Sequence, residues 1–263
     1  MTTVSDILKF IESIAPPCMK ESWDNVGLLC GSGQTEVTKI LVALDPFEHV
    51  CLEAAEVEAQ LIVTHHPLIF QPAKSITDET SIGRSILTLC RHGISAINAH
   101  TNLDMAPGGI NDILAAKLGL ENVQVLNPGG TDGEGRPYGL LHAGTVAEQP
   151  LEAFLGTVKQ NLGCEGLRYV SGGKPVRKVA VGGGSCAGGM LEALTAGCDT
   201  FVTADVKYNQ FWDAHDLGLN LIDAGHFQTE NPAMPILAER LRTAFPEVCV
   251  VVSENHRDCM KFY

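Results

Sequence analysis

The sequence predicts an α/β protein of two lobes, each with a mostly parallel or mixed sheet covered by helices. Short apolar runs of strand length alternate with amphipathic stretches of helical length along most of the 263 residues. Histidines and carboxylates follow several of these runs directly, which places them at the carboxyl ends of the expected strands. Because loops at that end of parallel strands converge on one crevice, we expect a metal site in such a cleft.

The expected elements of the first half follow one another regularly. A helix is expected over residues 4–14, because apolar side chains recur there at helical spacing before Pro16 and Pro17 end it. Strands are expected over residues 40–44, 61–64 and 94–97, and helices over about 47–59, 81–91 and 110–118. This alternation favours parallel strands joined by crossover helices.

A segment rich in turn-forming residues, 127–137, interrupts the pattern and has no apolar anchor. We place the lobe boundary there, with an N-terminal lobe over residues 1–126 and a C-terminal lobe over residues 127–263. Strands of the second half are expected over residues 140–146, 178–181, 200–203, 219–222 and 249–252. Residues from about 220 onward are expected to return to the metal cleft.

Composition limits the classes of partner. The formal net charge is -13, so the surface repels nucleic acid and anionic membranes, and we expect neither as a partner. No apolar run approaches the length that a bilayer-spanning helix requires. The nine cysteines are irregularly spaced and form no CxxC pair, which is typical of a reduced, cytoplasmic protein and argues against a thiolate metal site.

Three segments supply candidate metal ligands. His65 and His66 end an apolar run, and Pro67 turns the chain there, so both rings can face one site. His226 and Glu230 are four residues apart, and at the start of a helix they would lie on one face and reach one ion. Asp104 follows another expected strand, where its carboxylate could bridge two ions.

Each candidate also has an ordinary structural interpretation: a core or surface histidine, a helix-capping glutamate, a turn aspartate. Because all of these candidates are metal-binding residue types that follow expected strands, together they favour a metal centre. Imidazole and carboxylate together suit zinc, iron, manganese, cobalt or nickel, and the number of ligands exceeds what one structural zinc needs. We therefore expect two divalent ions per subunit and metal-dependent hydrolysis. His100 is interpreted as a catalytic group that moves protons, and Asp24 as a residue that supports the ligands.

Two further features have competing interpretations. The loop from Gly182 to Ala187 satisfies the G-x-G-x-x-G/A pattern, which makes a dinucleotide site a minor alternative. Close strand–helix packing, or a cradle for a substrate phosphate, is the favoured role of the loop through Gly189, and no organic cofactor is expected. Trp23 is either a core residue or a stacking surface for a base, and the core is the commoner position for a lone tryptophan.

Four sequence segments resemble the Nif-three-like family, whose members commonly carry the name GTP cyclohydrolase 1 type 2 homologue. They are residues 21–28 (ESWDNVGL), 64–68 (THHPL), 98–104 (NAHTNLD) and 223–230 (DAGHFQTE). Their order and length make the resemblance specific, and it runs from the first helix nearly to the C-terminus. One departure is Asn209, which follows Tyr208 where many relatives have a Tyr-His pair, so its role stays open. The short glycine-rich junction also lacks the extra domain of some relatives.

The resemblance implies a two-lobed subunit with a dinuclear metal site in the cleft between the lobes. It implies that the ligands are His65, His66, Asp104, His226 and Glu230. It also implies a toroidal homohexamer, a trimer of dimers, and hydrolytic opening of GTP at the purine C8. A small-molecule substrate, with nucleotides as the leading class, is therefore expected. Two alternatives stay open: a metal-dependent phosphoesterase, and a non-catalytic metal-binding scaffold or interaction protein.

Overall fold

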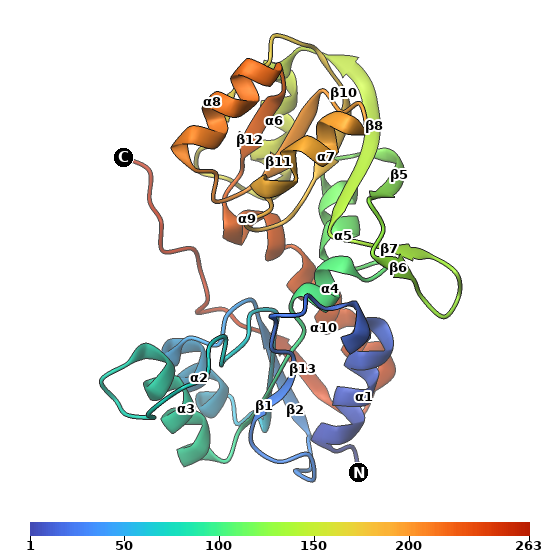
Figure 1. The fold of residues 1–263 in the computed structure, drawn as a ribbon. Coiled ribbons are helices and arrows are strands. Elements are labelled where there is room, and N and C mark those ends of the chain that lie inside the picture. The colour runs from blue at the N-terminus through green and yellow to red at the C-terminus, as the bar shows by residue number, and fades with distance from the viewer. The chain divides into compact units, whose positions relative to one another are not determined.

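The computed structural model describes residues 1–263, and the chain forms two compact units (Figure 1). Unit 1 comprises Met1–Leu103 and Met234–Asp258, and unit 2 comprises Asp104–Ala233 and Cys259–Tyr263. Each unit has its own mixed sheet and its own helices, so the predicted α/β class is confirmed. The glycine-rich segment 127–137 lies within unit 2.

The sheet of unit 1 has five strands in the order β1-β4-β3-β2-β13. Their bounds are Gly27–Cys30 for β1, Lys39–Ala43 for β2, Leu61–Thr64 for β3, Ser95–Asn98 for β4 and Cys249–Val252 for β13. All neighbours are parallel except β1, which pairs antiparallel with β4. Ala43 is in register with Thr64, and Thr64 with Asn98, so three strands end level with one another. The residues that follow these strands therefore leave the sheet at the same edge.

Capping residues mark the ends of helices in unit 1. They are α1 (Val4–Ile14), η1 (Pro17–Met19), α2 (Glu48–Glu56), α3 (Ser81–His92) and α10 (Ala233–Ala244). Thr3 and Asp6 form a capping box at the start of α1, which satisfies backbone donors that have no partner within the helix. Gly93 ends α3 in the left-handed conformation, with a φ of 66°, which a glycine adopts without steric cost.

One buried cluster of unit 1 lies between its sheet and the pair α2 and α3. Leu41 and Ile62 from the strands pack against Val50 of α2 and Leu89 of α3, and all four are almost fully buried. Burial of side chains of this size is worth about 1.5–3 kcal/mol each, so this face holds the strand ends in place.

Unit 2 has a six-stranded sheet in the order β5-β8-β10-β11-β12-β9, with a separate hairpin β6–β7. The strands are β5 (Glu121–Leu126), β6 (Gly130–Thr131), β7 (Pro137–Tyr138), β8 (Leu141–Gln149), β9 (Arg168–Val170), β10 (Val176–Val181), β11 (Thr200–Thr203) and β12 (Asn220–Asp223). The three strands β10, β11 and β12 are parallel, and the outer strands are antiparallel. The helices are α5 (Ile110–Lys117), α6 (Leu151–Leu162), η2 (Ala187–Gly189), α7 (Met190–Thr195), α8 (Tyr208–Leu217) and α9 (His226–Glu230), and α4 (Thr101–Met105) runs into the unit from unit 1.

Helices cover both faces of this sheet, because successive strand residues point to opposite sides. Val179 and Val181 of β10 belong to a buried cluster with Phe154 of α6. Ala180, between them, belongs to a second cluster with Phe201 of β11 and residues of α7 and α8. Two apolar layers thus hold the central parallel strands and fix where they end.

The predicted strand positions agree with the structure for several strands. Residues 200–203 form β11, residues 61–64 form β3, and residues 249–252 form β13, which pairs with β2 in unit 1. The strands β1, β5 and β9 were not predicted, and their residues are partly or largely exposed. None of the helices combines the length and apolar character that crossing a bilayer demands.

Candidate functional site

Three histidines gather at the carboxyl edge of the sheet in unit 1. His65 and His66 follow β3, and His100 follows β4 by two residues. The nitrogen atoms of these three side chains that could hold a metal lie within 4.8 Å of one another. The ring centroids of His65 and His66 are 4.9 Å apart, so the two adjacent rings lie close to each other. The gathering follows from the level ends of β3 and β4.

Each of these imidazoles has its Nδ1 atom against an oxygen that can only accept a hydrogen bond. The Nδ1 of His65 is 2.9 Å from the carbonyl oxygen of Ala99, and that of His66 is 2.7 Å from Oδ1 of Asp45. The Nδ1 of His100 is 2.8 Å from Oδ1 of Asp24. Nδ1 therefore carries the proton in all three rings, and Nε2 has the lone pair that a metal ligand or a proton acceptor needs.

The two supporting carboxylates are held in the ionised form. Burial alone would raise the pKa of Asp24, but hydrogen bonds from His100 and Thr101 outweigh it and lower that pKa to about 2. Burial also opposes ionisation of Asp45, yet hydrogen bonds from His256 and His66 hold its pKa well below the usual range. A carboxylate fixed in this way orients the imidazole and increases its basicity toward a metal.

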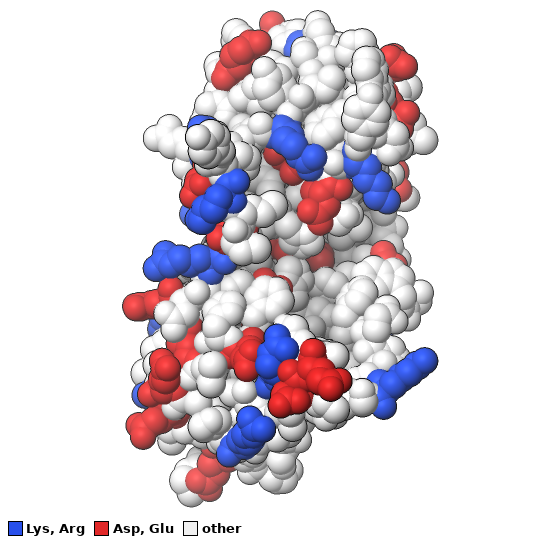
Figure 2. All heavy atoms as spheres, turned by 90° about the vertical axis from the view of Figure 1, so that its left-hand side faces the viewer, with Lys and Arg blue, Asp and Glu red and all other residues white.

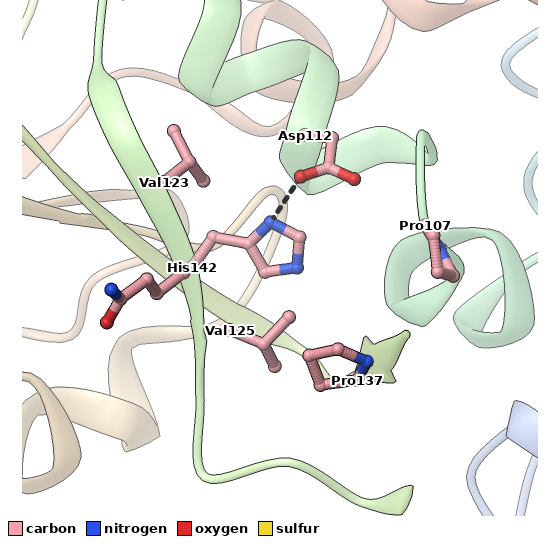
Figure 3. Close-up of a pocket in the computed structure, with 7 residues that line it drawn as sticks. Pro107, Asp112, Val123, Val125, Pro137 and His142 are labelled. Atoms are coloured by element: carbon pink, nitrogen blue, oxygen red, sulfur yellow. Dashed lines mark ion pairs between the residues drawn. The ribbon is translucent and has the colours of Figure 1, made fainter. Parts of the chain in front are cut away.

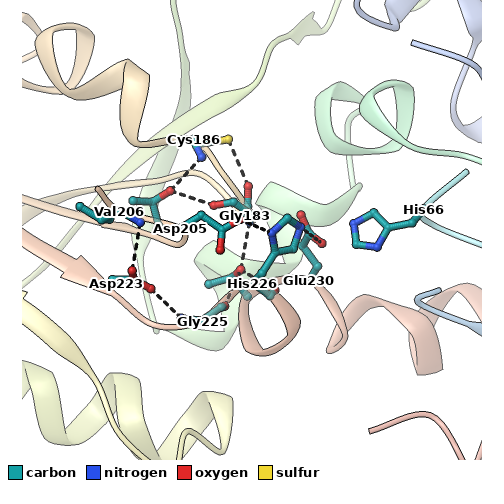
Figure 4. A network of polar contacts seen from close by, with 12 residues as sticks. His66, Gly183, Cys186, Asp205, Val206, Asp223, Gly225, His226 and Glu230 are labelled. Atoms are coloured by element: carbon teal, nitrogen blue, oxygen red, sulfur yellow. Dashed lines mark hydrogen bonds and ion pairs between the residues drawn. The ribbon is translucent and has the colours of Figure 1, made fainter. Parts of the chain in front are cut away.

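In unit 2, His226 and Glu230 are the first and last residues of the short helix α9 (Figure 4). The predicted i, i+4 geometry is present, with 3.1 Å between Nε2 of His226 and Oε2 of Glu230. The Nδ1 of His226 is 2.7 Å from Oδ2 of Asp205, which follows β11, so carboxylate oxygens lie against both nitrogens of this ring. Asp223 fixes the surrounding backbone, accepting hydrogen bonds from the amides of Val206 and Gly225.

Asp104 lies beside this pair. Its carboxylate and that of Glu230 have oxygen atoms within 4.8 Å of each other, and both side chains are buried. Two buried carboxylates this close repel one another unless a cation or a proton lies between them. The donor set of unit 2, one imidazole and two carboxylates, therefore suits a hard or borderline divalent metal.

The glycine-rich loop after β10 packs directly on α9. Gly184 has a φ of +60°, and its backbone amide donates to Oγ1 of Thr229 at 3.0 Å. A Cβ atom on Gly184 would overlap Oε1 of Glu230 and lie 2.9 Å from Nε2 of His226. These contacts support the close-packing role for the loop, because its glycines let the backbone approach the candidate ligands.

Other sequence-based expectations have mixed outcomes. Asp24 contacts the ring of His100 and not that of a predicted ligand, and Asp45, Asp205 and His256 were not recognised as supporting residues. Trp23 is not a core residue: its exposed fraction is 57%, so the commoner interpretation was wrong. Asn209 is exposed in the first turn of α8.

A separate hollow of about 400 Å³ lies in unit 2 and contains none of the candidate ligands (Figure 3). Its lining residues are Pro107, Asp112, Val123, Gln124, Val125, Pro137 and His142. The Nδ1 of His142 is 2.9 Å from Oδ1 of Asp112, which gives this deeply buried ring an acidic partner. No motif in the sequence pointed to this pair.

Charge on the exterior is mixed. On the face shown in Figure 2, lysine and arginine side chains are interspersed with aspartate and glutamate and form no continuous basic surface. The sequence as a whole has Asp+Glu 31 against Lys+Arg 18, so acidic side chains are in excess.

Sequence relatives cover nearly the whole chain. A Clostridium perfringens protein named GTP cyclohydrolase 1 type 2 homolog is 36% identical over 264 residues, which cover 98% of this chain and 99% of that protein. A Helicobacter pylori protein named GTP cyclohydrolase 1 type 2 is 32% identical, covering 92% of this chain and 93% of that protein.

Solved structures show the same fold. A Bacillus cereus protein related to NIF3 matches with a TM-score of 0.94 and 27% identity, covering 100% of this chain and 99% of that one. A Staphylococcus aureus protein matches with a TM-score of 0.91 and 29% identity over the same shares. The family described as Duf34/NIF3 (NGG1p interacting factor 3) matches residues 2–259. The Nif-three-like resemblance is thereby confirmed, and this chain belongs to the Duf34/NIF3 family.

Proposed function

We propose that this protein is a dinuclear metal-dependent hydrolase that acts on a nucleotide or a related small molecule. Its metal ligands would be His65, His66, Asp104, His226 and Glu230. The observation that carries the proposal is a shared contact: every candidate histidine ligand has Nδ1 against a carbonyl or carboxylate oxygen. Such contacts at the second ring nitrogen are the usual companions of metal-binding imidazoles.

The donor set fits the metal class expected from the sequence. Three imidazole nitrogens and two carboxylates suit zinc, iron, manganese, cobalt or nickel, and they exceed the four ligands of one structural zinc. The close approach of Asp104 and Glu230 also fits, because a cation between the two carboxylates would relieve their repulsion. When bound, two such ions supply an activated water and polarise the group that it attacks.

His100 would move protons in this reaction. Its ring lies with His65 and His66, and Asp24 keeps its Nδ1 protonated and its orientation fixed. The Nε2 atom can then accept a proton from the attacking water and return it to the leaving group. An imidazole suits this task because its pKa is ordinarily near neutrality.

The names of the relatives direct us to GTP as the first substrate to test. In cyclohydrolysis, water adds to C8 of the purine, the imidazole ring opens, and a second hydrolysis releases formate. We expect formate and a ring-opened product when the metal-loaded protein is incubated with GTP. His100→Gln should lower turnover while it leaves the bound metal unchanged. Phosphate release without formate would instead make the protein a phosphoesterase, and metal without any product would favour the scaffold role.

By the same family likeness we propose a homohexamer built as a trimer of dimers. The subunit mass is 28.1 kDa, so light scattering distinguishes a hexamer from a monomer or dimer without difficulty. A monomer at micromolar concentration would contradict this part of the proposal.

A further inference from the structure

Two exposed aromatic side chains stand beside His100 in unit 1. Trp23 has an exposed fraction of 57% and Phe70 of 46%. Their ring centroids are 5.7 Å apart with an interplanar angle of 67°, an edge-to-face arrangement. Each ring centroid is also 6.1 Å from the centroid of His100. Burying either ring would stabilise the fold, so their joint exposure next to a functional histidine calls for an explanation.

The surrounding hydrogen bonds hold this pair in place. Trp23 directly precedes Asp24, the residue that orients His100. The side-chain amide of Asn25 donates to the carbonyl oxygen of Ile69 at 2.7 Å, which ties the loop of Trp23 to the loop of Phe70. The side chain of Asn98, the last residue of β4, donates to the backbone of Asn25 at 3.0 Å. Both rings are therefore positioned by the strand ends that position the histidines, before any ligand arrives.

We propose that Trp23 and Phe70 form a subsite for a planar heteroaromatic ring of the substrate, with a purine base as the fitting class. The indole and phenyl rings offer an apolar, polarisable surface on which such a ring stacks, and stacking tolerates any base. Their contact with His100 would bring the stacked ring beside the group that moves protons. This inference rests on the proposed hydrolase function and adds the two residues that would hold the base of its substrate.

The chain contains two tryptophans, Trp23 and Trp212, which makes a direct binding assay practicable. Trp212 is exposed to a similar extent, 54%, but belongs to α8 in unit 2 and is therefore a matched control. In Trp212→Phe, all indole emission comes from Trp23; in Trp23→Phe, all of it comes from Trp212. The probe is guanosine 5′-monophosphate added to the full-length, zinc-loaded variants, with ribose 5-phosphate as the probe that lacks a base.

We expect the purine nucleotide to quench the emission of Trp212→Phe saturably, ribose 5-phosphate to leave it unchanged, and Trp23→Phe to show no saturable quenching. Adding Phe70→Ala to Trp212→Phe should raise the Kd for the nucleotide about five- to a hundredfold, as removal of a stacking aromatic does. Phe70→Leu is the milder variant if the alanine form does not fold, as judged by circular dichroism. The readout needs no turnover, so a catalytically silent protein can still confirm the subsite.

Three outcomes would overturn the inference. The first is no quenching in Trp212→Phe, and the second is equal quenching by ribose 5-phosphate. The third is a Trp23 emission that shifts with protein concentration together with a lower oligomer mass in Trp23→Ala, which would mean that a second copy of the chain covers the pair. Conversely, purine quenching without formate or phosphate release would leave the subsite standing and count against the hydrolase alone.

Discussion

Replacing Asp45 by Asn removes one negative charge behind His66 and changes almost nothing in shape. Asp45 accepts from Nδ1 of His66 at 2.7 Å and from Nε2 of His256 at 2.9 Å, one ring on each carboxylate oxygen. An amide has only one oxygen, so one of the two imidazoles would meet an N–H group in place of an acceptor. His66 would lose its fixed tautomer, its orientation, or both.

The size of the effect follows from burial. The side chains of His66 and Asp45 are only 19% and 17% exposed, so solvent screens their charge-assisted hydrogen bond weakly. Such a bond is worth about 1.5–3 kcal/mol, which corresponds to roughly a ten- to hundredfold loss of metal affinity. The equivalent pair of His226 and Asp205 is 33% and 50% exposed, so Asp205→Asn should cost about tenfold or less.

The assay is competition for zinc or cobalt against a chromogenic chelator, with the wild type and each variant at one pH. Asp216→Asn is the matched control, since Asp216 pairs with His215 at 3.1 Å on the exposed part of α8, away from every candidate ligand. We expect the order of loss Asp45→Asn, then Asp205→Asn, then no change for the control. Equal affinities for the Asp45 and Asp216 variants would refute the reasoning.

Three other predictions test the site and the fold. Gly184→Ala should weaken metal binding in the same assay, because its Cβ would displace Glu230. An unchanged affinity would show that the loop shifts to accommodate the methyl group. Asp24→Asn should flatten the acid-unfolding curve: the pKa of Asp24 is lowered from 3.8 to about 2, so its stabilising effect is full above pH ~4 and disappears as pH falls toward 2. Urea midpoints that fall equally with pH in both proteins would contradict this. Burial raises the pKa of Cys51 to about 12, so iodoacetamide should label exposed Cys259 long before Cys51, as followed by mass spectrometry; similar rates would contradict that burial.

Much of the fold could be predicted from the sequence because its central strands are buried on both faces. The run Leu-Ile-Val-Thr at residues 61–64 is apolar enough to give the bounds of β3 without any knowledge of its neighbours. The exposed edge strands lack this signal, and β5 in particular is exposed over most of its length. The pairing of β13 with β2 was also hidden, because it joins residues about 200 positions apart and no local pattern records a partner.

The candidate ligands could likewise be predicted, since they are metal-binding residue types that follow expected strands. The residues that support them could not be predicted. Asp45 precedes His66 by 21 residues, and only the parallel pairing of β2 with β3 brings them together. Asp205 reaches His226 in the same way through β11 and β12. The exposure of Trp23 depends on tertiary packing, whereas its residue type alone favoured the core.

The most direct test of the account is the metal content of the untagged protein, measured by elemental analysis after purification without chelators. We expect about two divalent ions per chain, as in dinuclear hydrolases, and a clear reduction in both His66→Ala and Glu230→Ala with the circular dichroism spectrum unchanged. His215→Ala should retain the full content. A protein that binds no divalent metal, or variants that keep as much as the wild type, would contradict the assignment of these histidines and carboxylates as a metal centre.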